Sequence, residues 1–173
     1  MTIFGSSRPG ETEPEYELAL QLGRALAEAG YAICNGGYGG TMEASARGAR
    51  EAHGHTIGVT VRSFGRTVNP WIAEEMATDS LMERILKLIQ TGDAYVVLKG
   101  STGTLLELAA VWEFANKGFM RQKPILILGD FWEGVVQTLK GELDREGLEN
   151  CTRFVERVDT PEACVLRLNE LLR

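Results

Sequence analysis

The chain has 173 residues, of which 44% are hydrophobic and 24% are charged, and this composition is typical of one globular domain with a core of its own. Its formal net charge of −6 and the lack of a basic stripe exclude duplex nucleic acid as a partner. No apolar run reaches the ~18–20 residues of a membrane span and no signal peptide is visible, so we expect a cytoplasmic protein that binds no membrane.

The first half of the chain alternates short apolar runs with segments of helical spacing. Strands are predicted at residues 2–4, 31–34 and 56–61, with helices at about 15–29 and 41–53 between them. The second helix is rich in small residues, which permits close packing. Residues 62–70 have little pattern, so we expect an exposed loop that carries Arg62 and Arg66.

The second half continues the alternation. Ser80 and Glu83 form a capping box that predicts a helix to about residue 91. The uncharged run 94–98 predicts a strand buried on both faces, and the apolar spacing from Leu105 to Trp112 predicts a helix that follows Thr104. The remaining predicted elements are a strand at 124–128, a helix from about 132, a short strand around 154–155 and a helix from 161.

Strands that alternate with helices indicate βαβ units. We therefore expect residues 1–173 to form a single Rossmann-like α/β domain, with a mainly parallel sheet and helices on both faces. In such sheets, ligands bind at the carboxyl ends of the strands, beside the point where the strand order reverses. Loops of small residues follow the strands that end at Phe4, Cys34 and Leu98, and we expect these loops to meet there.

The segment Gly100-Ser101-Thr102-Gly103-Thr104 joins a buried strand to a helix. Free backbone N–H groups and the positive end of the helix dipole converge at such a junction, and the glycines let the backbone approach an anion closely. This predicts a phosphate site with the Glu107 carboxylate close by. The same residues allow a second interpretation, because Thr104 and Glu107 have capping-box spacing and Glu107 could simply bind the start of the helix.

Two other nucleotide sites fit the sequence poorly. Gly37 and Gly39 lack the later glycine of a dinucleotide fingerprint, and no acidic residue closes the third strand. A P-loop requires a lysine after its glycines, whereas Lys99 precedes them. Neither an NAD site nor an ATPase is expected.

Taken together, four segments resemble the LOG (Lonely Guy) family, often labelled "possible lysine decarboxylase". These segments are Gly5-Ser6-Ser7, residues 35–43, Glu83-Arg84 and residues 100–107. The best-known members are phosphoribohydrolases that cleave cytokinin riboside 5′-monophosphates to free base and ribose 5-phosphate. Their signature is Pro-Gly-Gly-x-Gly-Thr-x-x-Glu. Gly100, Gly103, Thr104 and Glu107 match it, and Arg84 falls where the family's catalytic arginine lies.

Three residues depart from the family pattern. Lys99 replaces the proline, Ser101 replaces the second glycine, and Ile85 stands where a lysine usually follows the arginine. Residues 39–44 also look like the molybdenum cofactor carrier proteins, a sister branch that binds a phosphorylated cofactor without hydrolysing it. That branch supplies the alternative function of a non-catalytic nucleotide or cofactor carrier. No lysine suggests a pyridoxal site, so the decarboxylase label finds no support.

The resemblance implies that the chain hydrolyses the N-glycosidic bond of a purine nucleoside 5′-monophosphate, which can be N6-modified, with Arg84 and Glu107 as catalytic residues. The expected phosphate- and nucleotide-binding residues are Ser7, Gly36, Gly37, Gly39, Gly40, Gly100, Ser101, Thr102, Gly103 and Thr104. No metal or other cofactor is required.

The resemblance also implies a homodimer. The aromatic residues Trp112, Phe114 and Phe119 predict that the helix from Thr104 contributes to its interface. Lys99 has two interpretations, since its ammonium group could approach the bound phosphate or could remain in water.

Overall fold

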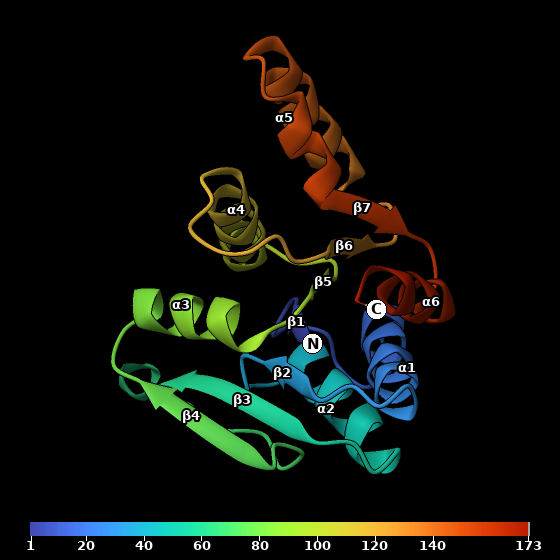
Figure 1. Ribbon diagram of the computed structural model, residues 1–173. Coiled ribbons are helices and arrows are strands. Elements are labelled where there is room, and N and C mark those ends of the chain that lie inside the picture. The colour runs from blue at the N-terminus through green and yellow to red at the C-terminus, as the bar shows by residue number, and fades with distance from the viewer. Residues whose placement is uncertain (173) are drawn as a thin grey trace.

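The strand order reverses at the centre of a parallel sheet (Figure 1). In the computed structural model, which describes residues 1–172, seven strands pair in the order β4-β3-β2-β1-β5-β6-β7, and all neighbours are parallel. The strands are β1 (Thr2–Phe4), β2 (Ile33–Asn35), β3 (Thr56–Val61), β4 (Glu74–Thr78), β5 (Tyr95–Val97), β6 (Ile125–Leu128) and β7 (Val155–Val158). β1 and β5 are paired at the reversal, with Ile3 opposite Val96. The predicted Rossmann-like α/β fold is confirmed.

Helices cover both faces of this sheet (Figure 1). They are α1 (Pro14–Glu28), α2 (Thr41–Glu51), α3 (Leu81–Thr91), α4 (Thr102–Asn116), α5 (Glu133–Arg145) and α6 (Pro161–Leu171), with short 3-10 turns η1 (Arg62–Phe64) and η2 (Glu149–Phe154). Helices α1, α2 and α6 pack on one face around Leu22, Ala44 and Leu168. Helices α3, α4 and α5 pack on the other face around Leu88 and Leu108. Because helices cover both faces, the central strands β2, β1, β5 and β6 are buried along their whole length.

Glycines bring the backbones of α1 and α2 into direct contact. A Cβ atom at Gly23 would lie 2.0 Å from the carbonyl oxygen of Ser45, and one at Gly48 would lie 2.0 Å from the carbonyl oxygen of Leu20. The small residues of α2 are therefore needed where the two helices meet, as the sequence predicted.

Three elements differ from the sequence predictions. Helix α4 begins at Thr102 with Ser101 as its N-cap, so the prediction that the helix follows Thr104 is wrong. No strand was predicted at Glu74–Thr78, because β4 is an edge strand whose residues are mostly exposed and polar. Within the expected loop at 62–70, residues 62–64 form η1.

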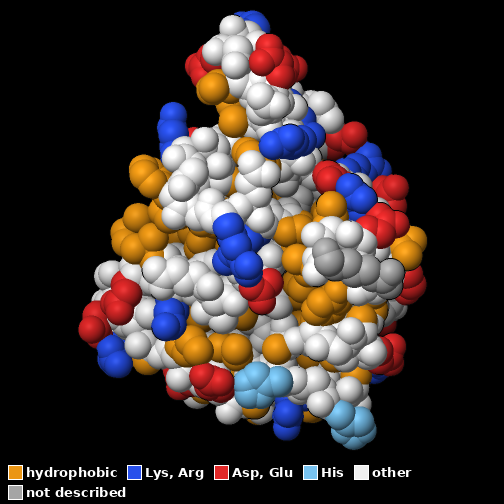
Figure 2. Space-filling view, viewed as in Figure 1, with side chains coloured by type: hydrophobic (Ala, Val, Ile, Leu, Met, Phe, Trp, Pro, Cys, Tyr) orange, Lys and Arg blue, Asp and Glu red, His pale blue; other side chains and the backbone are white. Residues whose placement is uncertain are grey.

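Exposed apolar side chains gather on one side of the molecule. Figure 2 shows hydrophobic side chains grouped on the surface over α3 and α4, at the left of the view. The most exposed large ones in this region are Met82 and Phe119, with 61% and 76% of their surface accessible. No helix within residues 1–172 combines the length and the apolar character needed to cross a membrane.

Candidate active site

A pocket lies at the strand-order reversal, at the carboxyl ends of the strands. Its volume is about 180 Å³, and it receives residues from the loops after β1, β2, β3 and β5 and from helices α2, α3 and α4. Ser7, Gly36, Arg84, Ser101, Gly103, Thr104 and Glu107 are the predicted site residues that line it. The expected meeting of the three small-residue loops is therefore observed, and it occurs where open α/β sheets bind their ligands.

Arg84 and Glu107 form a buried ion pair on the floor of this pocket. Nη1 of Arg84 lies 3.5 Å from Oε1 of Glu107, and the two residues are only 7% and 8% exposed. Arg84 projects from the inner face of α3, where its Nε donates a hydrogen bond of 2.8 Å to the carbonyl oxygen of Val59. Its guanidinium carbon also lies 5.6 Å from the centre of the Tyr38 ring. These contacts fix the orientation of the charged group.

The environment of Glu107 changes its proton affinity. Burial raises the pKa of the Glu107 carboxyl to about 7, although the neighbouring Arg84 guanidinium acts in the opposite direction. A carboxyl group with a pKa near neutrality can both take up and release a proton under working conditions, which suits a general base or acid.

The structure also decides between the two interpretations of Glu107. Because α4 begins at Thr102, Glu107 lies in the second turn of the helix and its carboxylate faces Arg84. Thr104 is inside the helix and does not cap it. The capping-box interpretation is wrong.

The start of α4 forms the wall of the pocket next to this pair. Ser101, Gly103 and the buried Thr104 line the pocket, and no side chain caps the helix, so the N–H groups of its first turn face an open position. Gly100 and Thr102 lie outside the lining. A Cβ atom at Gly100 would lie 2.1 Å from Oγ1 of Thr104, so this glycine allows the loop to fold against the helix.

The glycines after β2 have different positions. Gly36 lines the pocket and lies against the guanidinium group of Arg84. Gly37, Gly39 and Gly40 lie outside the lining. Gly40 has a φ of +68°, and a Cβ atom there would lie 2.3 Å from the carbonyl oxygen of Ser6, so it joins the start of α2 to the loop after β1.

Several lining residues were not among the predicted site residues. Arg8, Tyr38, Met42, Phe64 and Arg66 all line the pocket. The sequence offered two signals for them. Tyr38 stands between glycines, and Arg8 and Arg66 lie in loops that follow strands. Their meeting depends on the strand order, which brings the loop after β3 to the same edge of the sheet as β1.

Lys99 lies outside the pocket. Its Nζ is 2.5 Å from Oε1 of Glu15 on α1 and 5.8 Å from the centre of the Phe131 ring, and the side chain is 54% exposed. The idea that its ammonium group approaches a bound phosphate is not supported, because this ion pair holds it on the other side of the loop.

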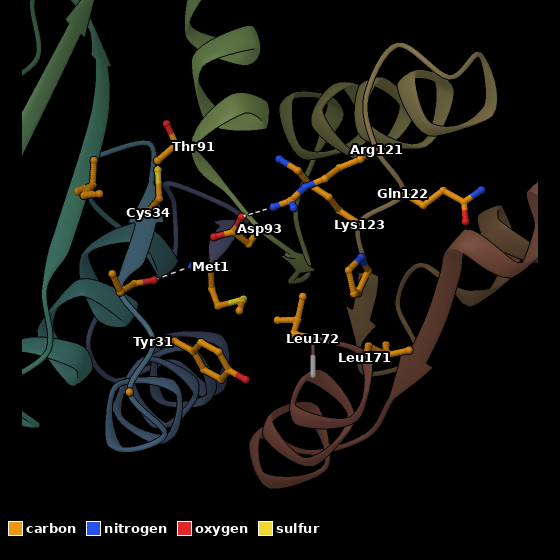
Figure 3. Close-up of a pocket in the computed structure, with 14 residues that line it drawn as sticks. Met1, Tyr31, Cys34, Thr91, Asp93, Arg121, Gln122, Lys123, Leu171 and Leu172 are labelled. Atoms are coloured by element: carbon orange, nitrogen blue, oxygen red, sulfur yellow. Dashed lines mark hydrogen bonds and ion pairs between the residues drawn. The ribbon is translucent and has the colours of Figure 1, made fainter.

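A larger cavity of about 610 Å³ lies at the opposite edge of the sheet (Figure 3). Its charged side chains already have partners: Arg121 is 2.8 Å from Asp93, and Lys123 donates to the backbone carbonyl oxygens of Ile89 and Gly92. The smaller pocket holds the better candidate site, because it contains the buried ion pair. Among residues 1–172, no cluster of three or more His, Cys, Asp or Glu side chains could hold a metal ion.

The chain is similar to known proteins over most of its length. It is 35% identical over 150 residues to a Mycobacterium tuberculosis protein named cytokinin riboside 5′-monophosphate phosphoribohydrolase, which covers 83% of this chain and 79% of the relative. A protein of Oryza sativa subsp. japonica with the same activity in its name is 26% identical over 175 residues, which is 97% of this chain and 72% of the relative.

Solved structures show the same fold. The molybdenum cofactor binding protein of Rippkaea orientalis matches with a TM-score of 0.76 and 26% identity, over 99% of this chain and 96% of that one. Residues 1–160 match the SLOG cluster4 family, and the chain belongs to this family.

Proposed function

We propose that the chain is a phosphoribohydrolase that cleaves the N-glycosidic bond of a purine nucleoside 5′-monophosphate. The observation that carries this proposal is the buried Arg84–Glu107 pair beside the uncapped start of α4. The start of α4 is suited to a phosphate and the Arg84–Glu107 pair to a sugar ring, which supports a phosphorylated ribose as the ligand. The M. tuberculosis relative supports the proposal, because it is 35% identical to this chain and is named as a phosphoribohydrolase of a riboside 5′-monophosphate.

In this proposal the phosphate binds at the N-terminus of α4. The N–H groups of the first turn and the hydroxyl groups of Ser101 and Thr104 donate hydrogen bonds to its oxygens. Ser7 approaches from the loop after β1. The 5′-phosphate then anchors the ribose with C1′ over the floor of the pocket, where Glu107 lies.

The reaction develops positive charge on the ribose ring as the base leaves. The C1′–N bond breaks with its electron pair on the base nitrogen, and the oxygen of a water molecule adds to C1′. The base nitrogen gains the proton that the water loses, so the step balances. The Glu107 carboxylate stabilises the cationic ring, accepts the proton of the attacking water and then releases it, so that the base nitrogen receives a proton and Glu107 is a carboxylate again. Arg84 holds this carboxylate in place and binds ribose hydroxyl groups through its remaining donors.

Chromatographic detection of free base tests the proposal. We expect release of base from purine nucleoside 5′-monophosphates and no release from the corresponding nucleosides, which lack the anchoring phosphate. Release from the nucleosides at the same rate would contradict the role assigned to α4.

The second candidate function is a carrier for a nucleotide or a phosphorylated cofactor. The likeness to the Rippkaea orientalis protein favours it, because that protein is named for binding the molybdenum cofactor. A carrier would bind nucleotides without turnover. Tight binding in calorimetry together with no release of base would therefore select this function.

We also propose that the protein is a homodimer that uses the exposed face of α3 and α4. Met82, Leu86 and Leu106 are exposed on these helices, and the exposed Phe119 follows α4. Trp112 is excluded from such an interface, since it is 3% exposed and its indole N–H donates to the carbonyl oxygen of Cys151. That part of the interface prediction is wrong.

A further inference from the structure

The end of the pocket away from α4 is aromatic and cationic. The Tyr38 ring is buried, and the guanidinium carbons of Arg84 and Arg66 lie 5.6 Å and 5.7 Å from its centre. The Phe64 ring is 6.2 Å from the Tyr38 ring, at an interplanar angle of 34°. A chain of contacts therefore runs from Glu107 through Arg84 and Tyr38 to Phe64 and Arg66.

The loop that carries Phe64 and Arg66 is attached to the pocket at both ends. The hydroxyl oxygen of Tyr38 accepts a hydrogen bond of 2.8 Å from the backbone N–H of Val61. At the other end, the side chain of Asn69 donates a 2.9 Å hydrogen bond to the carbonyl oxygen of Tyr38. The loop that carries Phe64 and Arg66 is therefore anchored to Tyr38 at both of its ends.

The proposed function determines how a bound nucleotide is oriented in this pocket. With the phosphate at α4 and C1′ beside Glu107, the base extends along the chain of contacts toward Phe64 and Arg66. Nucleotide-sized pockets usually enclose about 300–1,000 Å³. The pocket has a volume of about 180 Å³, so part of the nucleotide lies outside it, and the base is placed where 44% of the Phe64 surface is accessible for stacking.

Arg66 lies over the Tyr38 ring and offers its hydrogen-bond donors to the edge of that base. It forms no ion pair with any residue between 1 and 172, whereas Arg62 in the same loop pairs with Asp79. An arginine side chain offers only donors, in a planar fork. The base edge that this fork fits has two neighbouring acceptors, such as O6 and N7 of a 6-oxopurine. Adenine has a donating amino group in place of O6, and an N6 substituent adds bulk at the same position.

We infer that Arg66 selects nucleotides with a 6-oxopurine base, such as IMP and GMP, over AMP and N6-substituted AMP. This inference rests on the proposed function for the orientation of the ligand. It adds which purine bases the enzyme accepts in its nucleotide substrate.

The test compares release of base from IMP, GMP and AMP by the wild-type protein and by Arg66→Ala. We expect kcat/KM of the wild type to be about tenfold or more higher for IMP and GMP than for AMP. Arg66→Ala should bring the IMP-to-AMP ratio close to one. Arg62→Ala is the matched control, since this arginine lies in the same loop but outside the pocket lining, and it should keep the wild-type ratio.

The outcomes separate the two claims. If no nucleotide releases base, the proposed function fails, and calorimetric binding of IMP and AMP to the same variants then decides whether Arg66 selects the base. If base is released but AMP is preferred or equal, the proposed function stands and the selection by Arg66 is overturned. A wild-type ratio in Arg66→Ala would also overturn it.

Discussion

A Cβ atom at Gly36 would lie 1.7 Å from Nη2 of Arg84. The backbone after β2 therefore touches the guanidinium group directly, and Arg84 keeps its orientation toward Glu107 only because residue 36 has no side chain. The same guanidinium is bound on its other sides by the carbonyl oxygen of Val59 and the ring of Tyr38.

Gly36→Ala is expected to displace Arg84 and to lower kcat/KM on the order of 10²-fold, because small misplacements of a positioning group have large kinetic effects. Steady-state kinetics with the preferred nucleotide measures this loss. Gly141→Ala on α5 is the control, since a Cβ atom there would meet no neighbour within 4 Å. Wild-type kinetics in Gly36→Ala would show that the position of Arg84 is unimportant for the reaction.

Glu107→Gln is expected to lower kcat by on the order of 10²–10⁴-fold, the usual contribution of a general base. The amide keeps the shape of the side chain but cannot accept the proton of water or offset the charge of the ribose ring. Affinity for ribose 5-phosphate, measured by calorimetry, should stay close to that of the wild type, because the phosphate binds to α4. Undiminished turnover in this variant would remove Glu107 from the mechanism.

The raised pKa of Glu107 also predicts a pH-dependent stability. Between its ordinary value of 4.5 and the folded value of about 7, the carboxyl holds its proton in the folded protein but loses it in the unfolded chain. The contribution of Glu107 to stability is therefore fully present below about pH 4.5 and is lost as the pH rises toward about 7.

Urea unfolding of the wild type and Glu107→Gln at about pH 5 and about pH 8 measures this effect. The free energy of unfolding of the variant should rise relative to the wild type at the higher pH. Glu28→Gln, at an exposed glutamate of α1, serves as the comparison and should show no such change. An equal difference at both pH values would mean that burial does not perturb the Glu107 carboxyl.

The proposed dimer predicts a mass near twice the 19.0 kDa of the chain in light scattering at micromolar concentration. Phe119→Asp should shift the protein toward the monomer, because it places a charge in the apolar face over α3 and α4. Leu166→Asp is a matched control. Leu166 is 63% exposed but lies on α6, which covers the other face of the sheet. A wild-type mass near that of one chain would reject the dimer.

The elements that sequence reasoning predicted best are those whose pattern follows from burial on both faces. β5 and β6 are uncharged runs because helices cover them on either side, and their positions were predicted within one or two residues. β4 was missed because Glu74 and Glu75 lie on an exposed edge, where no apolar pattern is needed. The start of α4 was misplaced because Thr104 and Glu107 imitate a cap.

The site was predictable in part. Arg84 and Glu107 are recognisable through the family resemblance, but their pairing joins two helices and no local spacing reveals it. The contacts of Tyr38 with Phe64 and Arg66 depend on how the loop after β3 lies over the strand-order reversal. Such contacts follow from the order of the strands in the sheet, which a single sequence does not contain.

The polar groups of the pocket gather at the proposed phosphate and ribose positions, and this has a consequence for the order of product release. In the proposed complex the N–H groups of α4, Ser101, Thr104 and Arg84 bind the phosphate and the ribose, whereas the base stacks on Phe64, which is 44% exposed. In the proposed reaction the free base can therefore depart first, and ribose 5-phosphate remains until last. Ribose 5-phosphate should then inhibit competitively against the nucleotide, while the free base should inhibit non-competitively.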